Sequence, residues 1–129
     1  MIFLFGFNLT VRKKKKMSIF DLNMIGEDKI AEIVNRIATW YDPDKIILFG
    51  SYSSGKQSED SDLDLFVIKR SDLPRPQRAL QVRKMLFGMM VPMDLIVYTP
   101  DEIALSRDNK YSFVHEIMNT GKVLYERAT

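Results

Sequence analysis

The chain has 129 residues, 46% of them apolar, a size that suits one domain with a single hydrophobic core. It contains no cysteine, which excludes disulfide bonds, thiolate metal sites and a cysteine nucleophile and fits a cytoplasmic protein. The net charge of +2 depends on five basic residues at positions 12–16, so the remainder lacks the charge pattern of a nucleic-acid-binding domain. No apolar run reaches the roughly 18 residues that a membrane span needs.

The first 26 residues show no periodicity that would join them to a core, and we expect a mobile arm followed by a domain over residues 27–129. Lys and Arg codons can be purine-rich, and residues 12–16 directly precede Met17, as a ribosome-binding site precedes a start codon. This order predicts that natural translation begins at Met17. The alternative is a basic arm that steers the protein toward RNA or an acidic partner.

The domain opens with a predicted helix from Glu27 to about Trp40, because apolar residues recur there at helical spacing. Asp42-Pro43-Asp44 ends the helix, and residues 45–49 form the first predicted strand. A loop of small residues follows, and a second apolar strand runs from about 62 to 70.

The second half of the chain continues the alternation of helices and strands. A helix is predicted from Pro74 to about Met89 and a third strand over residues 93–98. Thr99 and Glu102 have the spacing of a capping box at the start of the next helix. A last helix covers about 111–119, and 122–125 can add a short strand. The pattern predicts a small α/β domain with a mixed sheet of three to four strands flanked by helices.

Two aspartates open the second predicted strand. Asp62 and Asp64 are two residues apart, so their carboxylates project from the same face of the strand and repel each other. A shared proton or a bound hard cation resolves such repulsion, and oxygen ligands favour Mg²⁺ or Mn²⁺. An isolated Asp-x-Asp pair is common in surface loops, but this pair is embedded in apolar residues, which a solvated loop does not explain.

The loop in front of the aspartates begins with Gly50 and Ser51, and strand–glycine–turn junctions let phosphate approach the backbone. Gly50-Ser51, ten further residues, and Asp62-Leu63-Asp64 together resemble the signature of the DNA polymerase β-like nucleotidyltransferase superfamily. The short chain is most similar to its minimal nucleotidyltransferases (MNT), encoded beside HEPN-domain proteins in toxin–antitoxin pairs. The resemblance extends from about Glu27 to Glu126 and implies the palm fold of that superfamily.

The resemblance also implies how the site is built. A third carboxylate is expected on a later strand, and Asp94 supplies one inside an apolar run. Asp62, Asp64 and Asp94 would then hold two Mg²⁺ ions, or Mn²⁺, as metal ligands and catalytic residues. Gly50 and Ser51 would hold the β- and γ-phosphates of ATP. Relatives often carry Arg or Tyr in the loop after Gly-Ser, where this chain has Ser53-Ser54.

Other residues allow two interpretations each. Lys56 can reach a phosphate from the loop or be solvated. The basic residues of the 74–89 helix form a solvated face or a docking surface for an acidic or RNA-associated partner. His115 is interpreted as a packing or surface residue rather than a base. The methionines at 85, 89, 90 and 93 fill the core or, second, form an adaptable partner surface.

Three functions compete. The first is a Mg²⁺-dependent nucleotidyltransferase that transfers AMP from ATP to a partner protein; the resemblance implies a HEPN ribonuclease toxin modified on a tyrosine. The second is an antitoxin that neutralises its partner by contact alone. The third is nucleotidyl transfer to a small molecule or nucleic acid. Because one small domain cannot build a deep acceptor cleft, we expect a second protein to complete the site.

Overall fold

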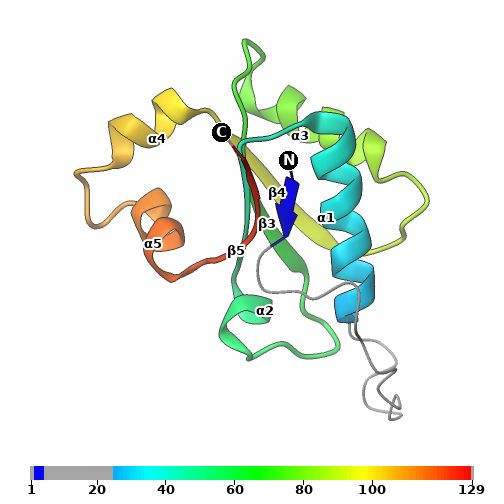
Figure 1. Ribbon diagram of the computed structural model, residues 1–129. Helices are drawn as coiled ribbons and strands as arrows, with labels where there is room; N and C mark the ends of the chain where they lie inside the picture. Colours follow the sequence, from blue (N-terminus) through cyan, green and yellow to red (C-terminus); the bar gives the residue numbers. More distant parts are fainter. Residues whose placement is uncertain (1, 5–24, 129) are drawn as a thin grey trace.

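A five-stranded mixed sheet forms the centre of the computed structural model, which describes residues 2–4 and 25–128 (Figure 1). Its order is β1-β5-β2-β3-β4. The strands are β1 (Ile2–Leu4), β2 (Lys45–Phe49), β3 (Leu63–Ile68), β4 (Met93–Tyr98) and β5 (Lys122–Arg127). Only β3 and β4 run parallel; each other neighbouring pair is antiparallel. The predicted α/β class and mixed sheet are confirmed.

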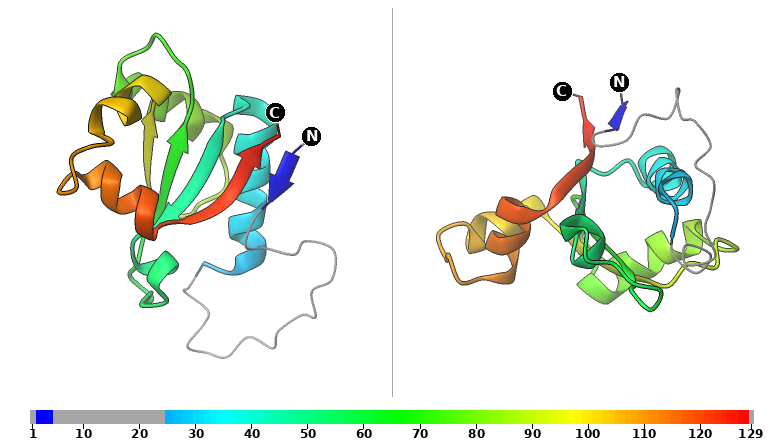
Figure 2. Two further views of the ribbon diagram at one scale, coloured as in Figure 1. Left: turned by 60° about the vertical axis from the view of Figure 1, so that its left-hand side comes forward. Right: turned by 90° about the horizontal axis from the view of Figure 1, so that it is seen from below.

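Helices cover both faces of the sheet. They are α1 (Glu27–Tyr41), α2 (Ser51–Ser54), α3 (Arg75–Met85), α4 (Pro100–Ser106) and α5 (Phe113–Thr120). Seen from below, α1 and α3 lie on one side of the sheet and α4 and α5 on the other (Figure 2). None of the helices in the described ranges is both long enough and apolar enough to cross a membrane.

Alternating side chains of the strands supply two separate cores. Leu65 and Val67 of β3 belong to the larger cluster, which also contains the buried face of α1 and Val82 of α3. Phe66 points to the opposite face, where it packs with Val114 and Ile117 of α5 in the smaller cluster. This period of two assigns every residue of β3 to one face or the other, including its aspartate.

Three elements differ from the sequence-based expectations. Helix α3 ends at Met85 instead of Met89, and the turn that follows contains Gly88 at a φ of 86°. The first residues of the predicted loop after Gly50 form the short helix α2. Residues Ile2–Leu4 form an edge strand on β5, where the sequence predicted a mobile arm; positions 5–24 lie outside the described residues.

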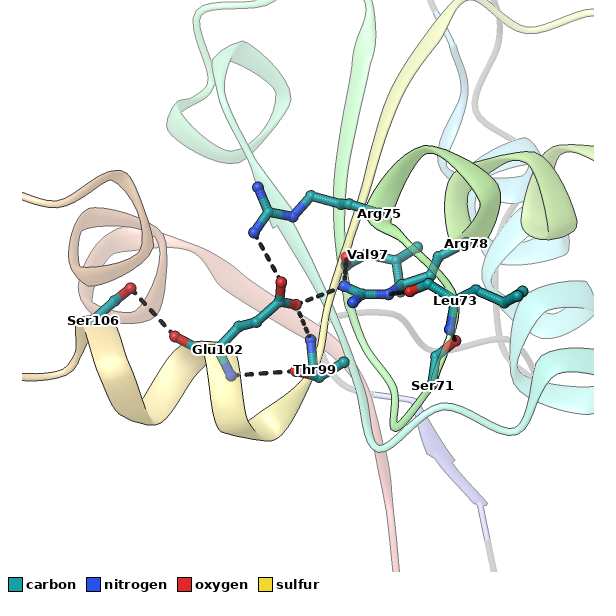
Figure 3. A network of polar contacts seen from close by, with 8 residues as sticks. All are labelled: Ser71, Leu73, Arg75, Arg78, Val97, Thr99, Glu102 and Ser106. Atoms are coloured by element: carbon teal, nitrogen blue, oxygen red, sulfur yellow. Dashed lines mark hydrogen bonds and ion pairs between the residues drawn. The ribbon is translucent and has the colours of Figure 1, made fainter.

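A polar network joins α3 to α4 across the end of β4 (Figure 3). The buried guanidinium of Arg78 donates to the Val97 carbonyl at 3.1 Å and to Glu102 Oε1 at 2.5 Å, and Arg75 donates to Glu102 Oε2 at 2.9 Å. Glu102 also accepts from the Thr99 amide at 2.8 Å, which completes the predicted capping box.

The same network accounts for part of the basic surface predicted for α3. Arg78 is buried, Arg75 is engaged by Glu102 and lies 4.0 Å above the Tyr98 ring, and Arg83 donates to the Met93 carbonyl at 3.2 Å. Arg78 and Arg83 thus donate to carbonyls of the edge strand β4, and Arg75 and Arg78 tie α3 to α4 through Glu102. Arg75 and Arg83 remain exposed to solvent.

Candidate functional site

The structure brings two of the three predicted acidic residues directly together. Asp64 is the second residue of β3, and the parallel register places it opposite Asp94 on β4. On its other side Asp64 lies opposite Phe49, the last residue of β2. Asp62 immediately precedes β3, on the same face by alternation. Asp62 and Asp94 are exposed and Asp64 is half-buried, so the carboxylates lie at a sheet end that solvent can reach.

The raised pKa of Asp64 reflects both its burial and the repulsion within this carboxylate cluster. Burial, followed by the charge and hydrogen bond of the neighbouring Asp94 and the charge of Asp62, raises the pKa of its carboxyl to about 6. Each of these causes penalises the ionised form. Without a counter-charge, the cluster therefore holds a proton near neutral pH more tightly than a free carboxyl does.

Gly50 is the residue against which Asp64 packs. It has a φ of 72° and a ψ of −153°, a conformation that disfavours any side chain. A Cβ at this position would overlap Asp64 Oδ2 and approach Cγ to 3.0 Å. Gly50 thus makes room for the carboxylate itself. From the sequence, this glycine was explained only by the approach of a phosphate to the backbone.

The turn after Gly50 carries the other predicted binding residues. Ser51 begins α2, and its carbonyl accepts from the Lys56 amide at 3.0 Å, which closes the turn. The Lys56 side chain is exposed. Tyr52 fastens α2 to the rest of the domain, because its hydroxyl accepts from the Ile25 amide at 3.0 Å. In the described part of the chain, no hydrogen bond or ion pair joins Ser51 or Lys56 to the three carboxylates.

The donor set suits a hard divalent cation, but the carboxylates do not form a closed metal site. In residues 2–4 and 25–128, no three Asp, Glu, His or Cys side chains converge as a complete ligand group. Mg²⁺ is commonly held by one or two carboxylates together with substrate phosphates and water. A half-site of oxygen ligands at an open sheet end therefore fits a metal that arrives with a nucleotide.

Comparison with known proteins agrees with this geometry. Residues 28–129 match the family model described as Polymerase beta, Nucleotidyltransferase. The chain belongs to this nucleotidyltransferase family. It is an α/β enzyme of nucleotidyl transfer, as the Gly-Ser and Asp-x-Asp motifs predicted.

Two relatives come from Methanocaldococcus jannaschii. One, named "Putative protein adenylyltransferase MJ0604", is 32% identical over 101 residues, which cover 77% of this chain and 97% of the relative. The other, "Putative protein adenylyltransferase MJ0141", is 28% identical over 78 residues, covering 60% of this chain and 75% of the relative. A solved structure titled as a putative nucleotidyltransferase from Sulfolobus solfataricus is 22% identical, covers 60% of this chain and 69% of its own, and has a TM-score of 0.48.

An aromatic pair beside the carboxylates of this nucleotidyltransferase was missed in the sequence. Phe49 and Phe113 meet edge to face, with ring centroids 5.6 Å apart and planes at 85°. Phe49 precedes Gly50, so its position in front of the Gly-Ser motif was a usable signal. Phe113 gave no signal, because only the docking of α5 onto the sheet brings it to this end.

One hollow in the described part of the structure lies on the face of the sheet opposite the carboxylates. It measures about 390 Å³ and is lined by the end of α3 and the turn before β4. Its lining residue Met93 packs against the larger core, whereas the adjacent Asp94 points the opposite way along the strand. Another hollow, of about 260 Å³, lies between α4 and α5, and the half-buried His115 is one of its lining residues.

Proposed function

We propose that this nucleotidyltransferase transfers AMP from ATP to a hydroxyl group of a partner protein in a reaction that needs Mg²⁺ or Mn²⁺. The observation that carries the proposal is the pairing of Asp64 with Asp94 at the start of two parallel strands, with Asp62 beside them. The names of the two archaeal relatives support a protein as the acceptor.

In the proposed reaction the acceptor oxygen attacks the α-phosphorus of ATP. The bond from that phosphorus to the bridging oxygen of the β-phosphate breaks, pyrophosphate leaves, and the hydroxyl proton passes to solvent. A bound divalent cation would supply charge neutralisation at the α-phosphate and the leaving group. Asp62, Asp64 and Asp94 would hold the cation together with the nucleotide, and the missing side chain of Gly50 leaves room for the Asp64 carboxylate.

The phosphate side of the proposed site is the turn at Gly50 and Ser51, which would bind the β- and γ-phosphates. Its backbone lies directly against the Asp64 carboxylate, so phosphates bound there and cations bound to the aspartates would be adjacent. Lys56, exposed at the end of the same turn, is proposed as a further phosphate contact.

We also propose that the partner is a HEPN-domain toxin and that the chain acts as its antitoxin. This step rests on the similarity of the chain to minimal nucleotidyltransferases. It is consistent with carboxylates that stand open to solvent at a sheet end, where a second protein can present an acceptor.

The test uses the chain together with the protein encoded beside it. ATP labelled on the α-phosphate should transfer its label to that protein in the presence of Mg²⁺, and ATP labelled on the γ-phosphate should not. Chelation of the metal should stop the transfer. Tight binding of the two proteins without any transfer of label would instead support neutralisation by contact and contradict the enzymatic proposal.

A further inference from the structure

We propose that Phe113, supported edge-on by Phe49, is the surface on which the base of the nucleotide stacks. The inference rests on the proposed function, because it assigns the base end of the same ATP whose phosphates the aspartates and Gly50 receive. It names a binding residue, Phe113, that lies outside both sequence motifs.

The register of the sheet places the aromatic pair beside the reaction site. Phe49 lies directly opposite Asp64 in the antiparallel pairing of β2 and β3, where side chains of one face are within contact distance. Phe49 shares its face with Phe66, so it projects toward α5, as Asp64 does. Phe113, at the start of α5, contacts Phe49 from that side. The order across this face is therefore carboxylate, Phe49, Phe113.

The same order matches the order of groups in a nucleoside triphosphate. The α-phosphate, which must lie at the carboxylates, connects through one ribose to the base. A base one ribose away from Asp64 on this face would meet the aromatic pair next. On the opposite face of the sheet, α1 and α3 and their core occupy the corresponding space (Figure 2).

The exposure of Phe113 is not explained by the packing of α5. Val114 and Ile117 of this helix are buried and already anchor it on the sheet, whereas Phe113 remains 47% exposed. Its contact with Phe49 fixes the ring without covering it. A fixed, half-exposed aromatic ring is a suitable platform for a base, since every base has a π face and stacking on aromatic rings is favourable.

Stacking also predicts the selectivity of the site. Because stacking reads the π surface and not the hydrogen-bonding edge of a base, purine nucleotides should bind more tightly than pyrimidine nucleotides, with little difference between ATP and GTP. The platform alone would thus explain a preference for ATP over CTP or UTP.

The test measures the affinity of the full chain for two probes, ATP and inorganic tripolyphosphate, each with Mg²⁺, by calorimetry. Phe113→Ala should weaken ATP binding about tenfold and leave tripolyphosphate binding unchanged, because only ATP carries a base. Phe113→Tyr, which keeps a ring, should restore ATP affinity. Tyr111→Ala is the matched control, since Tyr111 is 86% exposed just before the same helix; its variant should bind both probes as the parent does.

Three results would overturn the inference. Equal ATP affinity in Phe113→Ala and the parent would show that the ring does not contact the base. Equal weakening for ATP and tripolyphosphate would mean that Phe113 only supports the local structure, as would failure of Phe113→Tyr to restore binding. Absence of ATP binding by the parent is a separate outcome that contradicts the proposed function itself, and with it the inference.

Discussion

Asp64 carries the strongest electrostatic signature in the site. Burial and the neighbouring Asp94 and Asp62 raise the pKa of its carboxyl to about 6, against 3.8 for a free aspartate. The folded state therefore binds this proton more tightly than the unfolded state, so the raised pKa favours the fold at low pH. That contribution is lost as pH rises between about 4 and 6.

This shift predicts that Asp64→Asn stabilises the metal-free protein at neutral pH. The gain should be about 1–2 kcal/mol above pH 6, less than the full shift implies because Asp64 is partly solvated, and it should vanish below pH 4. Chemical denaturation in a chelator at several pH values measures it. Asp60→Asn, in the exposed loop, is the control and should show no such difference. A stability gain that did not depend on pH would contradict the assigned cause.

Gly50 is the second residue whose role can be isolated. Gly50→Ala should lose about 1 kcal/mol or more of stability from its positive φ and should also displace the Asp64 carboxylate, so nucleotidyl transfer falls sharply. Gly88→Ala is a matched control, because Gly88 also has a positive φ, of 86°, but no atom lies within 4 Å of its Cβ position. Equal transfer by the two variants in a rate assay would exclude the positioning role of Gly50.

At the scale of elements, the junction of α3, β4 and α4 depends on Glu102. Burial disfavours the ionised form of Glu102 and alone would raise its pKa. Hydrogen bonds from the Thr99 amide and from the guanidinium groups of Arg78 and Arg75 outweigh burial and lower the pKa to about 2. The ionised form is therefore the one the fold selects, and it remains so down to strongly acidic pH.

Removing this carboxylate should be costly, because Arg78 would stay buried without its counter-charge. We expect Glu102→Ala to lose about 3 kcal/mol of stability and Thr99→Ala, which removes one capping hydrogen bond, about 1 kcal/mol. Equilibrium unfolding at neutral pH measures both. Similar losses in the two variants would mean that capping, and not the buried ion pair, stabilises this junction.

Elements with a strong local pattern could be predicted from the sequence. The apolar runs gave β2, β3 and β4 nearly to the residue, and Thr99 with Glu102 marked the start of α4. Helix α2 could not be predicted, because its four residues, three serines and Tyr52, have no periodicity and glycines flank it at both ends. Strand β1 could not either, since its partner β5 lies at the far end of the chain.

The candidate site likewise contains residues that could be predicted from the sequence and contacts that could not. Asp62 and Asp64 could be selected from spacing, because strand alternation is a local rule, and Gly50 from the junction of a strand with a turn. Asp94 was expected only from the family resemblance. The contact between Gly50 and Asp64, the side-by-side register of Asp64 and Asp94, and the meeting of Phe49 with Phe113 depend on strand order and helix docking. These are tertiary properties without a local sequence pattern.

For the whole molecule, the two edge strands of the sheet differ in their distance from the candidate site. The site lies on β2, β3 and β4, and β1 is separated from them by β5. A protein that begins at Met17 would lack β1, and we expect β2, β3 and β4 around the carboxylates to keep their pairing. We expect it to fold cooperatively with a melting temperature only a few degrees lower and to transfer nucleotide at the parent rate. Thermal unfolding and a rate assay check this, and loss of cooperative unfolding would show that β1 is essential.

The central claim is that the carboxylates at the start of β3 and β4 perform nucleotidyl transfer. The most direct measurement compares the transfer rate from ATP labelled on the α-phosphate in the parent, Asp62→Asn, Asp64→Asn and Asp60→Asn proteins, all with the same Mg²⁺ and acceptor. Loss of a metal-holding charge should reduce the rate by roughly 10² or more in the first two variants, and the Asp60→Asn control should keep it. Transfer at the parent rate by a folded Asp62→Asn or Asp64→Asn protein would contradict the account.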